Sequence, residues 1–225
     1  YGDESALQAA WNNGTAAFET AGVPDVGERA ATTAGIFRDP RRERKIIDYY
    51  RCQHELVADL VVHFCRAAKE HWTRPIIAGA FYGYFFSMFG RQAAGGHLEP
   101  HRVLDSPSVD YLAGPQSYDA ESLLPGGAYR PRSLADTVRL HGKLWLDEMD
   151  QKPHLTFETN GGGFNGDIGI AKGAVRRNVL AALCRGAGLW FYDFGPAFGY
   201  IGWWDHPALI EEIRGLKTLA DDLKD

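Results

Sequence analysis

The sequence predicts an α/β fold of the (β/α) barrel type, and three observations support this prediction. Short apolar segments that read as strands occur at intervals, at Ile76–Tyr84, Val109–Ala113, Lys143–Asp147 and Gly188–Tyr192. Stretches with helical spacing of apolar residues separate these segments, and no hairpin signal joins two of them directly. The strand residues are apolar on both parities, which is typical of a parallel sheet buried on both faces.

Helix signals begin before the first strand. Ser5–Trp11 is interpreted as the end of a helical segment, and residues 14–37, rich in Ala, Gly and Thr, are expected to form a loop. Asp39 followed by Pro40 is typical of a helix start, because Asp caps the first turn and Pro fits its first position. We therefore expect a long amphipathic helix from Asp39 to about His71.

Shorter helices complete the pattern. They are expected at His97–Asp105, Ser133–His141 and Ile170–Arg185, with a final helix starting at Asp205. Gly186 is the expected stop of the helix before the last strand. A complete barrel needs eight βα units in typically about 250 residues. Four units in 225 residues therefore predict half of an elaborated barrel.

Composition and charge restrict the class of protein. With 45% hydrophobic residues the chain can bury a sizeable core, and residues 1–225 are treated as a single region. The net charge of −5 gives no reason to expect a nucleic-acid partner, and no apolar run is long enough for a membrane span. Gly161–Gly163 lacks the lysine of a phosphate loop, and no metal or other cofactor is expected. The chain begins with Tyr1 rather than Met, so we expect a fragment, and its compartment stays open.

The segment Lys143–Asp150 carries the strongest functional signal. Its apolar strand runs directly into Asp147, Glu148 and Asp150, three carboxylates within four residues. Acids at the C-terminal end of a barrel strand indicate general acid/base or nucleophilic chemistry, so Glu148 is the candidate catalytic residue. Strand parity leaves open whether Asp147 or Glu148 faces the centre. A solvated acidic loop, or a metal site built from Asp147 and Asp150, are the alternatives.

Aromatic residues gather at and beyond the last two strands. They are Trp145, Trp190, Tyr192, Phe198, Tyr200, Trp203 and Trp204. Sugar rings stack on aromatic faces and their hydroxyl groups need polar partners, so carbohydrate is the expected ligand. Trp190 and Trp203 are the candidate stacking surfaces, and core packing is the alternative for each. The candidate polar contacts are Gln116, Tyr118 and Asp193.

Two further pairs of residues have both a structural and a functional interpretation. Tyr82 and Tyr84 share one face of an expected strand and can hydrogen-bond a carboxylate or a ligand, although barrel packing explains them equally well. His97 and His101 are four residues apart, as in a metal-binding pair. Pro100 between them makes a poor ligand helix, and His97 is instead a candidate cleft residue.

Five segments distributed over most of the chain together carry a family resemblance. They are Ala6–Trp11, Phe81–Tyr84, Ser106–Tyr111, Val138–Glu148 and Gly186–Asp193. They resemble the catalytic barrel of β-galactosidase-like glycoside hydrolases, and glycoside hydrolase family forty-two is the nearest family. The motifs are moderately specific and do not fix the sugar.

The resemblance implies a (β/α)₈ TIM barrel with two catalytic glutamates. One follows the fourth strand as acid/base, and the other follows the seventh strand as nucleophile. If the four strands are the fifth to the eighth, Glu148 falls at the nucleophile position, where Tyr82 or Tyr84 would position it. Trp190 falls on the eighth strand, where a sugar-contacting aromatic is common. The acid/base would lie upstream of Tyr1, so the expectation is the C-terminal half of a retaining hydrolase.

The same residues leave two other functions open. A non-catalytic carbohydrate-binding protein would use the aromatic residues without needing Glu148. A metal-dependent hydrolase would use Asp147, Glu148 and Asp150 together. A half-barrel also exposes two strand edges, so we expect it to pair with its missing half or with a second copy of the chain.

Overall fold

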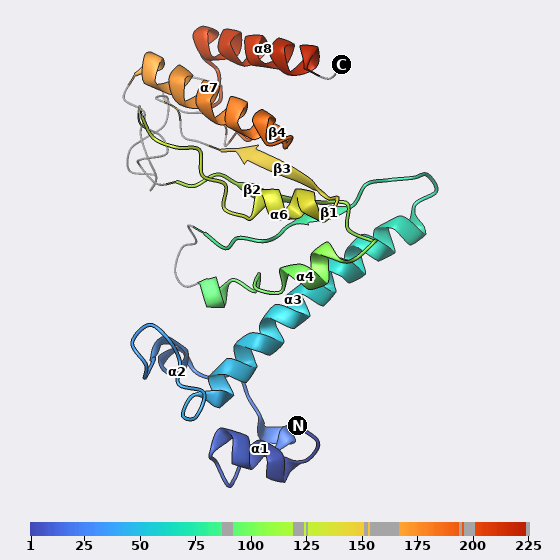
Figure 1. Ribbon diagram of the computed structural model, residues 1–225, viewed down its shortest axis with the longest axis vertical. Helices are drawn as coiled ribbons and strands as arrows, with labels where there is room; N and C mark the ends of the chain where they lie inside the picture. Colours follow the sequence, from blue (N-terminus) through green and yellow to red (C-terminus); the bar gives the residue numbers. More distant parts are fainter. Residues whose placement is uncertain are drawn as a thin grey trace.

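The computed structural model describes residues 1–86, 92–118, 124, 126–150, 153, 167–193, 195 and 201–223. Its centre is a parallel sheet of four strands in the order β1-β2-β3-β4 (Figure 1). The strands are β1 (Gly79–Phe81), β2 (Tyr111–Pro115), β3 (Leu144–Met149) and β4 (Gly188–Phe191). This arrangement confirms the α/β fold with parallel strands, although β1 is shorter and β3 longer than expected.

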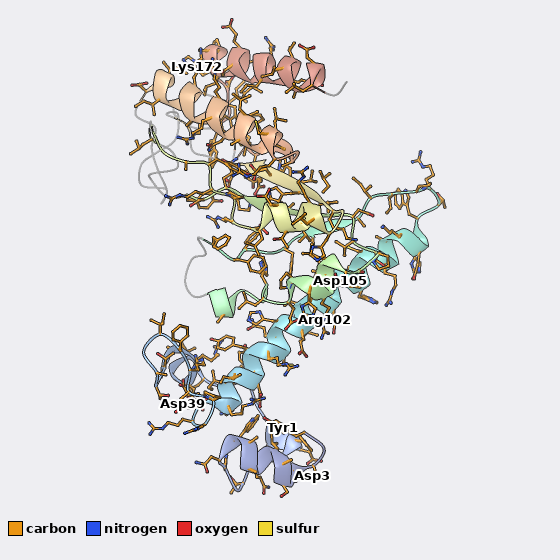
Figure 2. All side chains as sticks on the ribbon, in the orientation of Figure 1. Tyr1, Asp3, Asp39, Arg102, Asp105 and Lys172 are labelled. Carbon is orange, nitrogen blue, oxygen red and sulfur yellow. The ribbon has the colours of Figure 1, made fainter. Side chains whose placement is uncertain are left out.

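Helices alternate with these strands along the chain. They are α1 (Glu4–Trp11), α2 (Val26–Ala30), α3 (Arg44–His71), α4 (Pro100–Leu104), α6 (Ala135–Leu140), α7 (Ile168–Cys184) and α8 (Pro207–Asp222), with short 3-10 turns at Phe18–Thr20 and Gln92–Ala94. The long helix α3 runs from the N-terminal region up to the sheet, and α7 and α8 lie together near the C-terminus (Figure 1). Arg102 of α4 (labelled in Figure 2) forms an ion pair with Asp59 of α3 at 2.8 Å, which ties α4 to the long helix.

One face of the sheet packs against the helices. Leu112 of β2 and Trp145 of β3 are at most 1% exposed and belong to the main core. The same core contains residues of four helices, namely Ala58 and Cys65 of α3, Val103 and Leu104 of α4, Ala135 and Val138 of α6 and Ala182 of α7. Because side chains alternate along a strand, the neighbours of Leu112 and Trp145 point to the opposite face.

That opposite face is partly open. We call it the open face and define it by Phe81, Leu144, Glu148 and Trp190, which alternate with the helix-facing residues. Phe81 is 50% exposed and Leu144 is 38% exposed. The rings of Phe81 in β1 and Trp190 in β4 meet at 5.7 Å and at 90°. Three strand spacings of about 4.8 Å would separate these strands by about 14 Å in a flat sheet, so the contact indicates that the sheet curves around the open face.

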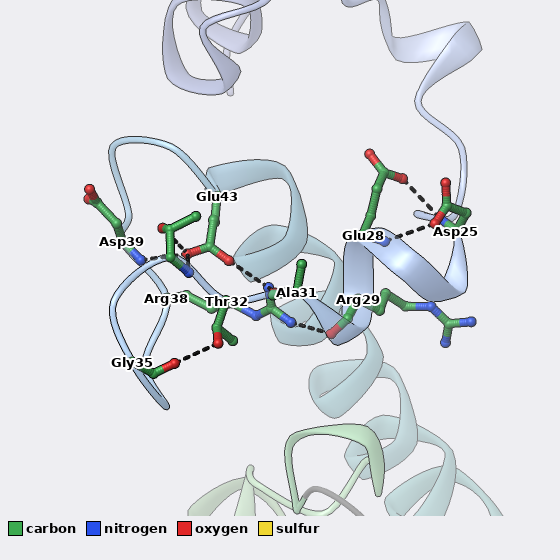
Figure 3. Close-up of polar contacts among 10 residues, drawn as sticks. Asp25, Glu28, Arg29, Ala31, Thr32, Gly35, Arg38, Asp39 and Glu43 are labelled. Carbon is green, nitrogen blue, oxygen red and sulfur yellow. Dashed lines mark hydrogen bonds and ion pairs between the residues drawn. The ribbon is translucent and has the colours of Figure 1, made fainter.

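The N-terminal region departs from the sequence prediction at two helices. The Asp3 side chain accepts a hydrogen bond from the Ala6 N–H at 2.8 Å and caps α1, so Ser5–Trp11 belongs to a helix that begins here. Residues 14–37 were expected to be a loop throughout, but α2 lies within them. Its start is fixed by a capping box between Asp25 and Glu28 (Figure 3).

The long helix α3 starts later than predicted because hydrogen bonds to Glu43 fix the conformation of the residues before it. The Glu43 carboxylate accepts hydrogen bonds from Thr33, Arg38 and the backbone of Asp39 (Figure 3). Asp39 is therefore held in a turn, and its own carboxylate accepts from the Arg41 N–H at 2.9 Å. The prediction that Asp39 caps the helix was wrong, and α3 begins at Arg44.

The helix ends near the C-terminus agree with the prediction. Gly186 follows α7 with a φ of +63°, a conformation that favours glycine and ends a helix. His206 caps α8 through its side chain, and Pro207 occupies the first helical position. Among the described residues, no helix combines the length and the apolar character that crossing a bilayer requires.

Candidate functional site

Glu148 lies inside β3, on the open face, near the C-terminal end of the strand. Its register partners are Pro115 in β2 and Trp190 in β4. Partners in neighbouring strands lie about 4.8 Å apart and point to the same side, so the half-buried carboxyl and the Trp190 indole are adjacent. This placement answers the question that strand parity left open, because Glu148 and not Asp147 lies on the open face.

Asp147 points to the helix-facing side and is fully buried. Its carboxylate accepts a hydrogen bond from Gln116 Nε2 at 2.5 Å and one from the indole N–H of Trp145 at 3.3 Å. Burial raises the pKa of Asp147 to about 6, and the bonds from Gln116 and Trp145 oppose that rise. Asp147 is therefore one end of a buried polar network and not a surface acid.

Gln116 was expected to contact a sugar, but the structure places it inside the same network. Its side chain is 1% exposed, and its Nε2 also lies 2.8 Å from the sulfur of Met149. Its Oε1 accepts a hydrogen bond from Asn178 of α7 at 2.7 Å. Each polar atom of the Gln116 amide thus has a protein partner, and the residue joins α7 to β3. Asn178 is a further member of this network that the sequence pattern did not single out.

Asp150 and Tyr118 form a second polar group at the strand ends. The Tyr118 hydroxyl donates a hydrogen bond to Asp150. The guanidinium of Arg132 lies 3.9 Å from the centre of the Tyr118 ring, and its Nε donates to the Gln116 carbonyl at 3.0 Å. Arg132 is only 4% exposed, so a buried positive charge stands among these acids. Sequence reasoning missed Arg132, because an arginine in a Pro- and Gly-rich loop reads as a surface residue.

The charge state of Glu148 is set by these neighbours. Burial raises the pKa of Glu148 to about 7, and the negative charges of Asp150 and Asp147 act in the same direction. Arg132 lowers the pKa and partly compensates for both effects. No donor among the described residues forms a hydrogen bond with the Glu148 carboxylate. A carboxyl with a pKa of about 7 is poised to change protonation state near neutral pH, which is a common property of catalytic acids and bases.

Tyr82 and Tyr84 occupy different environments. Tyr82 is fully buried in the main core, and its hydroxyl accepts the Glu99 N–H at 3.2 Å, so it serves packing in this structure. Tyr84 is half-buried, and its ring occupies the space that a side chain at Gly114 would need. Burial, and then the Glu148 carboxylate, raise the pKa of Tyr84 above its ordinary value. Of the two tyrosines, Tyr84 is the one whose pKa the charge of Glu148 raises.

Asp193, the second residue after β4, is hydrogen-bonded within the chain. Asp193 accepts hydrogen bonds from the Gly195 N–H at 2.7 Å and the Trp203 N–H at 3.1 Å. Trp203 is 8% exposed and packs with α7 and α8 in a second core. The hydrogen bond between Asp193 and Trp203 thus connects the end of β4 to the residues before α8. Trp190, in contrast, lies on the open face as the register partner of Glu148.

The three acids do not converge on one point. Asp147 and Glu148 point to opposite faces of β3, which is a poor arrangement for ligands of one ion. Across the described ranges, no group of three or more His, Cys, Asp or Glu side chains is arranged to hold a metal ion. His97 lies before α4, which begins at Pro100, so His97 and His101 do not share a helix.

Comparison of the chain with models of protein families, with curated proteins and with solved structures finds no match. Function therefore rests on the geometry of the site.

Proposed function

We propose that the chain is the C-terminal half of the catalytic (β/α)₈ barrel of a retaining, β-galactosidase-like glycoside hydrolase, with Glu148 as nucleophile. One observation carries the proposal. Glu148 is the acid that lies on the open face, at the C-terminal end of a parallel strand and beside Trp190. In barrels built of parallel strands, that end and the inner face hold the chemistry. The curvature indicated by Phe81 and Trp190 is consistent with a barrel wall.

The proposed reaction begins with the ionised carboxylate. An oxygen of Glu148 attacks the anomeric carbon and forms a glycosyl ester, while the bond from that carbon to the leaving oxygen breaks. The leaving oxygen takes the bonding electron pair and receives a proton from a second carboxylic acid, about 5–5.5 Å away in a retaining enzyme. That acid is proposed to lie upstream of Tyr1. Water then cleaves the ester and restores the Glu148 carboxylate.

Three side chains remain as proposed sugar contacts. Trp190 offers an aromatic face beside Glu148, which suits the C–H face of a sugar ring. Tyr84 and Tyr118 are phenols near the acids, and burial keeps both neutral by raising the pKa of each. The phenol of Tyr84 can donate a hydrogen bond to a hydroxyl or to a carboxylate, whereas the Tyr118 hydroxyl already donates to Asp150 and offers a sugar its oxygen as an acceptor. Tyr82, Gln116 and Trp203 are omitted from the contacts because they are buried in packing or hydrogen bonds within the chain. Asp193 is exposed, but it is omitted because its Oδ1 accepts two backbone hydrogen bonds that fix the chain after β4.

Covalent labelling tests the nucleophile directly. We expect a 2-deoxy-2-fluoro glycoside with a dinitrophenyl leaving group to add one fluorosugar to the natural full-length protein. Dinitrophenolate departs without protonation, so the label reports the nucleophile and not the acid. Peptide mass spectrometry should place the sugar on Glu148. In Glu148→Gln the labelling rate should fall by roughly a thousand-fold or more, as for removal of other nucleophiles.

An exposed glutamate provides the matched control. Glu211→Gln on α8 removes the same charge outside the site and should label like the wild type. A label on any other carboxylate, or an unchanged rate in Glu148→Gln, would show that the nucleophile is assigned wrongly. The pH profile adds a second criterion. A nucleophile with a pKa of about 7 labels faster as pH rises through that value, whereas a general acid loses its proton there.

A non-catalytic carbohydrate-binding protein is the second candidate, and the ring pair of Phe81, which is 50% exposed, and Trp190, which is partly exposed, favours it. These two rings meet edge to face on the open face and offer a stacking surface without any carboxylate. In that case the fluorosugar binds without labelling, and Glu148→Gln keeps its affinity for sugars. Trp190→Ala should then abolish binding, which titration of the tryptophan fluorescence with galactosides and glucosides would detect.

The open face also bears on partners. Phe81 and Leu144 on this face, and Ile77 just before β1, are all more than a third exposed. We propose that the upstream half of the barrel, or a second copy of this chain, covers them. Light scattering after size-exclusion chromatography distinguishes these partners, because the isolated chain forms a homo-oligomer only if a second copy does so.

A further inference from the structure

Arg132 connects the ends of two strands through both its backbone and its side chain. Its carbonyl accepts hydrogen bonds from the Phe85 N–H at 2.9 Å and the Phe86 N–H at 3.1 Å, in the segment after β1. Its Nε donates at 3.0 Å to the carbonyl of Gln116, the first residue after β2. A single residue of the connection between β2 and α6 thus contacts the chain beyond β1 and the chain beyond β2, at the C-terminal end of the sheet.

The residues on either side of Arg132 are fixed to the same two strand ends. The Ser117 N–H donates to the Arg130 carbonyl at 2.8 Å. Ser133 lies close to Gly83, where a Cβ would stand 2.8 Å from the Ser133 Oγ. Gly83 has a φ of +91°, a conformation that favours glycine, and its missing side chain makes this close approach possible. The backbone therefore holds the Arg132 side chain in a defined position.

The Arg132 guanidinium lies over an aromatic ring. Its central carbon is 3.9 Å from the centre of the Tyr118 ring, and Arg132 is only 4% exposed. A contact this short, away from bulk water, is favourable because the ring face carries negative charge density and the guanidinium is weakly hydrated. The planar guanidinium also covers the ring, so it restricts the movement of the Tyr118 side chain.

The ring held in this way directs its hydroxyl to the end of a third strand. The Tyr118 hydroxyl donates a hydrogen bond to Asp150, the first residue after β3. Burial raises the pKa of Tyr118, so the phenol keeps its proton and stays a donor at neutral pH. The Asp150 N–H in turn donates to the Glu148 carbonyl at 3.1 Å. Direct contacts thus lead from Arg132 to the strand that carries Glu148.

We propose that Arg132 is a positioning residue, which holds the Tyr118 hydroxyl on Asp150 and so fixes the Tyr118 oxygen where a sugar hydroxyl can donate to it. The contacts among these three residues lie within the chain, whereas their consequence for sugar binding rests on the proposed hydrolase function. The role requires the shape of the guanidinium and not its charge alone, because a planar group both covers the ring and donates through Nε.

Arg132→Lys separates shape from charge. Lysine keeps the positive charge but loses the planar contact and the Nε donor. Tyr118→Phe keeps the ring under the guanidinium and removes the hydroxyl. Combining the two substitutions completes a double-mutant cycle, which measures whether the two residues act together. Arg214→Lys is the matched control, because Arg214 is an exposed residue of α8.

Nuclear magnetic resonance of the natural full-length protein, with labelled aspartate and arginine, gives readouts that do not require turnover. Tyr118→Phe should change the ¹³C shift of the Asp150 carboxyl, because that carboxyl loses a donor. Arg132→Lys should change it in the same direction, and the double variant no more than Tyr118→Phe alone. Arg214→Lys should leave it unchanged. In the wild type, the Tyr118 ring current should shift the Arg132 guanidinium protons upfield.

Fluorosugar labelling supplies the functional readout, because its concentration dependence separates the dissociation constant of the fluorosugar from the maximal labelling rate. Arg132→Lys should raise the dissociation constant about threefold to tenfold, as expected for the loss of one hydrogen bond. The maximal rate should stay within about twofold of the wild type, because the nucleophile is unchanged. Tyr118→Phe should show the same separation, and the double variant should exceed neither single variant.

Three outcomes overturn the proposal. An Asp150 shift that Arg132→Lys leaves unchanged would show that the charge alone suffices. Fully additive effects in the double variant would show that Arg132 does not act through Tyr118. Guanidinium protons at ordinary shifts in the wild type would exclude the contact itself, and this measurement decides the matter even if Arg132→Lys does not fold. Absence of labelling with the Asp150 changes present would reject the hydrolase function and leave the positioning of Tyr118 intact.

Discussion

Glu43 and Glu148 are glutamates with opposite environments, one in the N-terminal region and one in the sheet. The Glu43 carboxylate accepts four hydrogen bonds, from Thr33 N–H, Thr33 Oγ1, Arg38 and the Asp39 N–H. The pKa of Glu43 falls to about 2, chiefly through the Thr33 bond. In the described part of the chain, Glu148 has no hydrogen-bond donor, and burial with two acidic neighbours raises its pKa to about 7.

The difference distinguishes an acid that stabilises the fold from the acid that we propose as the nucleophile. Glu43 is surrounded by donors that need a permanent negative charge, and its removal would leave those donors without an acceptor. Glu148 is held among groups that oppose its charge, so its environment costs stability and leaves its oxygens free to react. Strained or uncompensated groups of this kind are common at functional sites. The region around Glu43 is therefore expected to tolerate substitution poorly, and Glu148 to tolerate it well.

The largest effect is expected when each glutamate is replaced by glutamine. Glu148→Gln should lose labelling but keep or slightly raise the melting temperature, because the neutral amide relieves repulsion from Asp147 and Asp150. Glu43→Gln should lower the melting temperature by several degrees, since an amide offers one acceptor oxygen where the carboxylate uses two. Differential scanning calorimetry of the two variants beside Glu211→Gln provides the comparison. A stabilised Glu43→Gln or a strongly destabilised Glu148→Gln would contradict it.

A smaller effect should appear in the pH dependence of stability. Because the folded-state pKa of Glu43 lies below its ordinary 4.5, its contribution is present above pH 4.5 and is lost as pH falls towards 2. Glu148 has the opposite sign, because its folded-state pKa is raised. Its neutral form favours folding below pH 4.5, and that advantage is lost as pH rises through about 7.

Urea unfolding at constant ionic strength measures the free energy of unfolding in both pH ranges, below and above pH 4.5. Glu43→Gln should flatten the profile between pH 2 and 4.5, and Glu148→Gln should flatten it between 4.5 and 7. Asp147 contributes to the second window with the same sign, since its pKa is raised to about 6. If Glu148→Gln instead changed the free energy of unfolding between pH 2 and 4.5, the prediction that the two glutamates act in different pH ranges would be wrong.

The sequence predicted the sheet more reliably than the helix starts. The four strands were recognisable because each is an apolar run between helical patterns, and burial on the helix side requires such runs. The start of α3 was predicted wrongly. Asp39 before Pro40 is a local helix-start signal, but hydrogen bonds between Glu43 and residues further back in the chain determine where the helix begins. Glu43 accepts hydrogen bonds from Thr33, Arg38 and Asp39, and the spacing of residues in the sequence does not reveal these contacts.

The candidate site was predicted in part. Glu148 was selected from its place after an apolar run, and the structure places it on the open face, beside Trp190. Gln116 and Asp193 were expected to contact a sugar, and those roles stay predictions. Polar residues at strand ends can serve a ligand or the protein itself, and here both side chains hydrogen-bond within the protein. Arg132 and Asn178 come from a loop and a helix face, and only the fold brings them to Gln116 and Tyr118, which follow β2.

The smallest expected effect tests the two faces of β3 against each other. Asn178→Ala removes the donor to the buried Gln116 Oε1 and should lower the free energy of unfolding by about 1–3 kcal/mol. Thr218→Ala, at an exposed position on α8, should stay within about 0.5 kcal/mol of the wild type. Urea unfolding measures both variants.

Labelling of Glu148 in Asn178→Ala should stay close to the wild-type rate, because the Asn178–Gln116–Asp147 network lies on the helix-facing side and Glu148 on the open face. If the labelling rate fell together with stability, the two faces of β3 would be coupled. Asp147 would then have to be counted among the residues that position the nucleophile, since it is the member of the network adjacent to Glu148 in the strand.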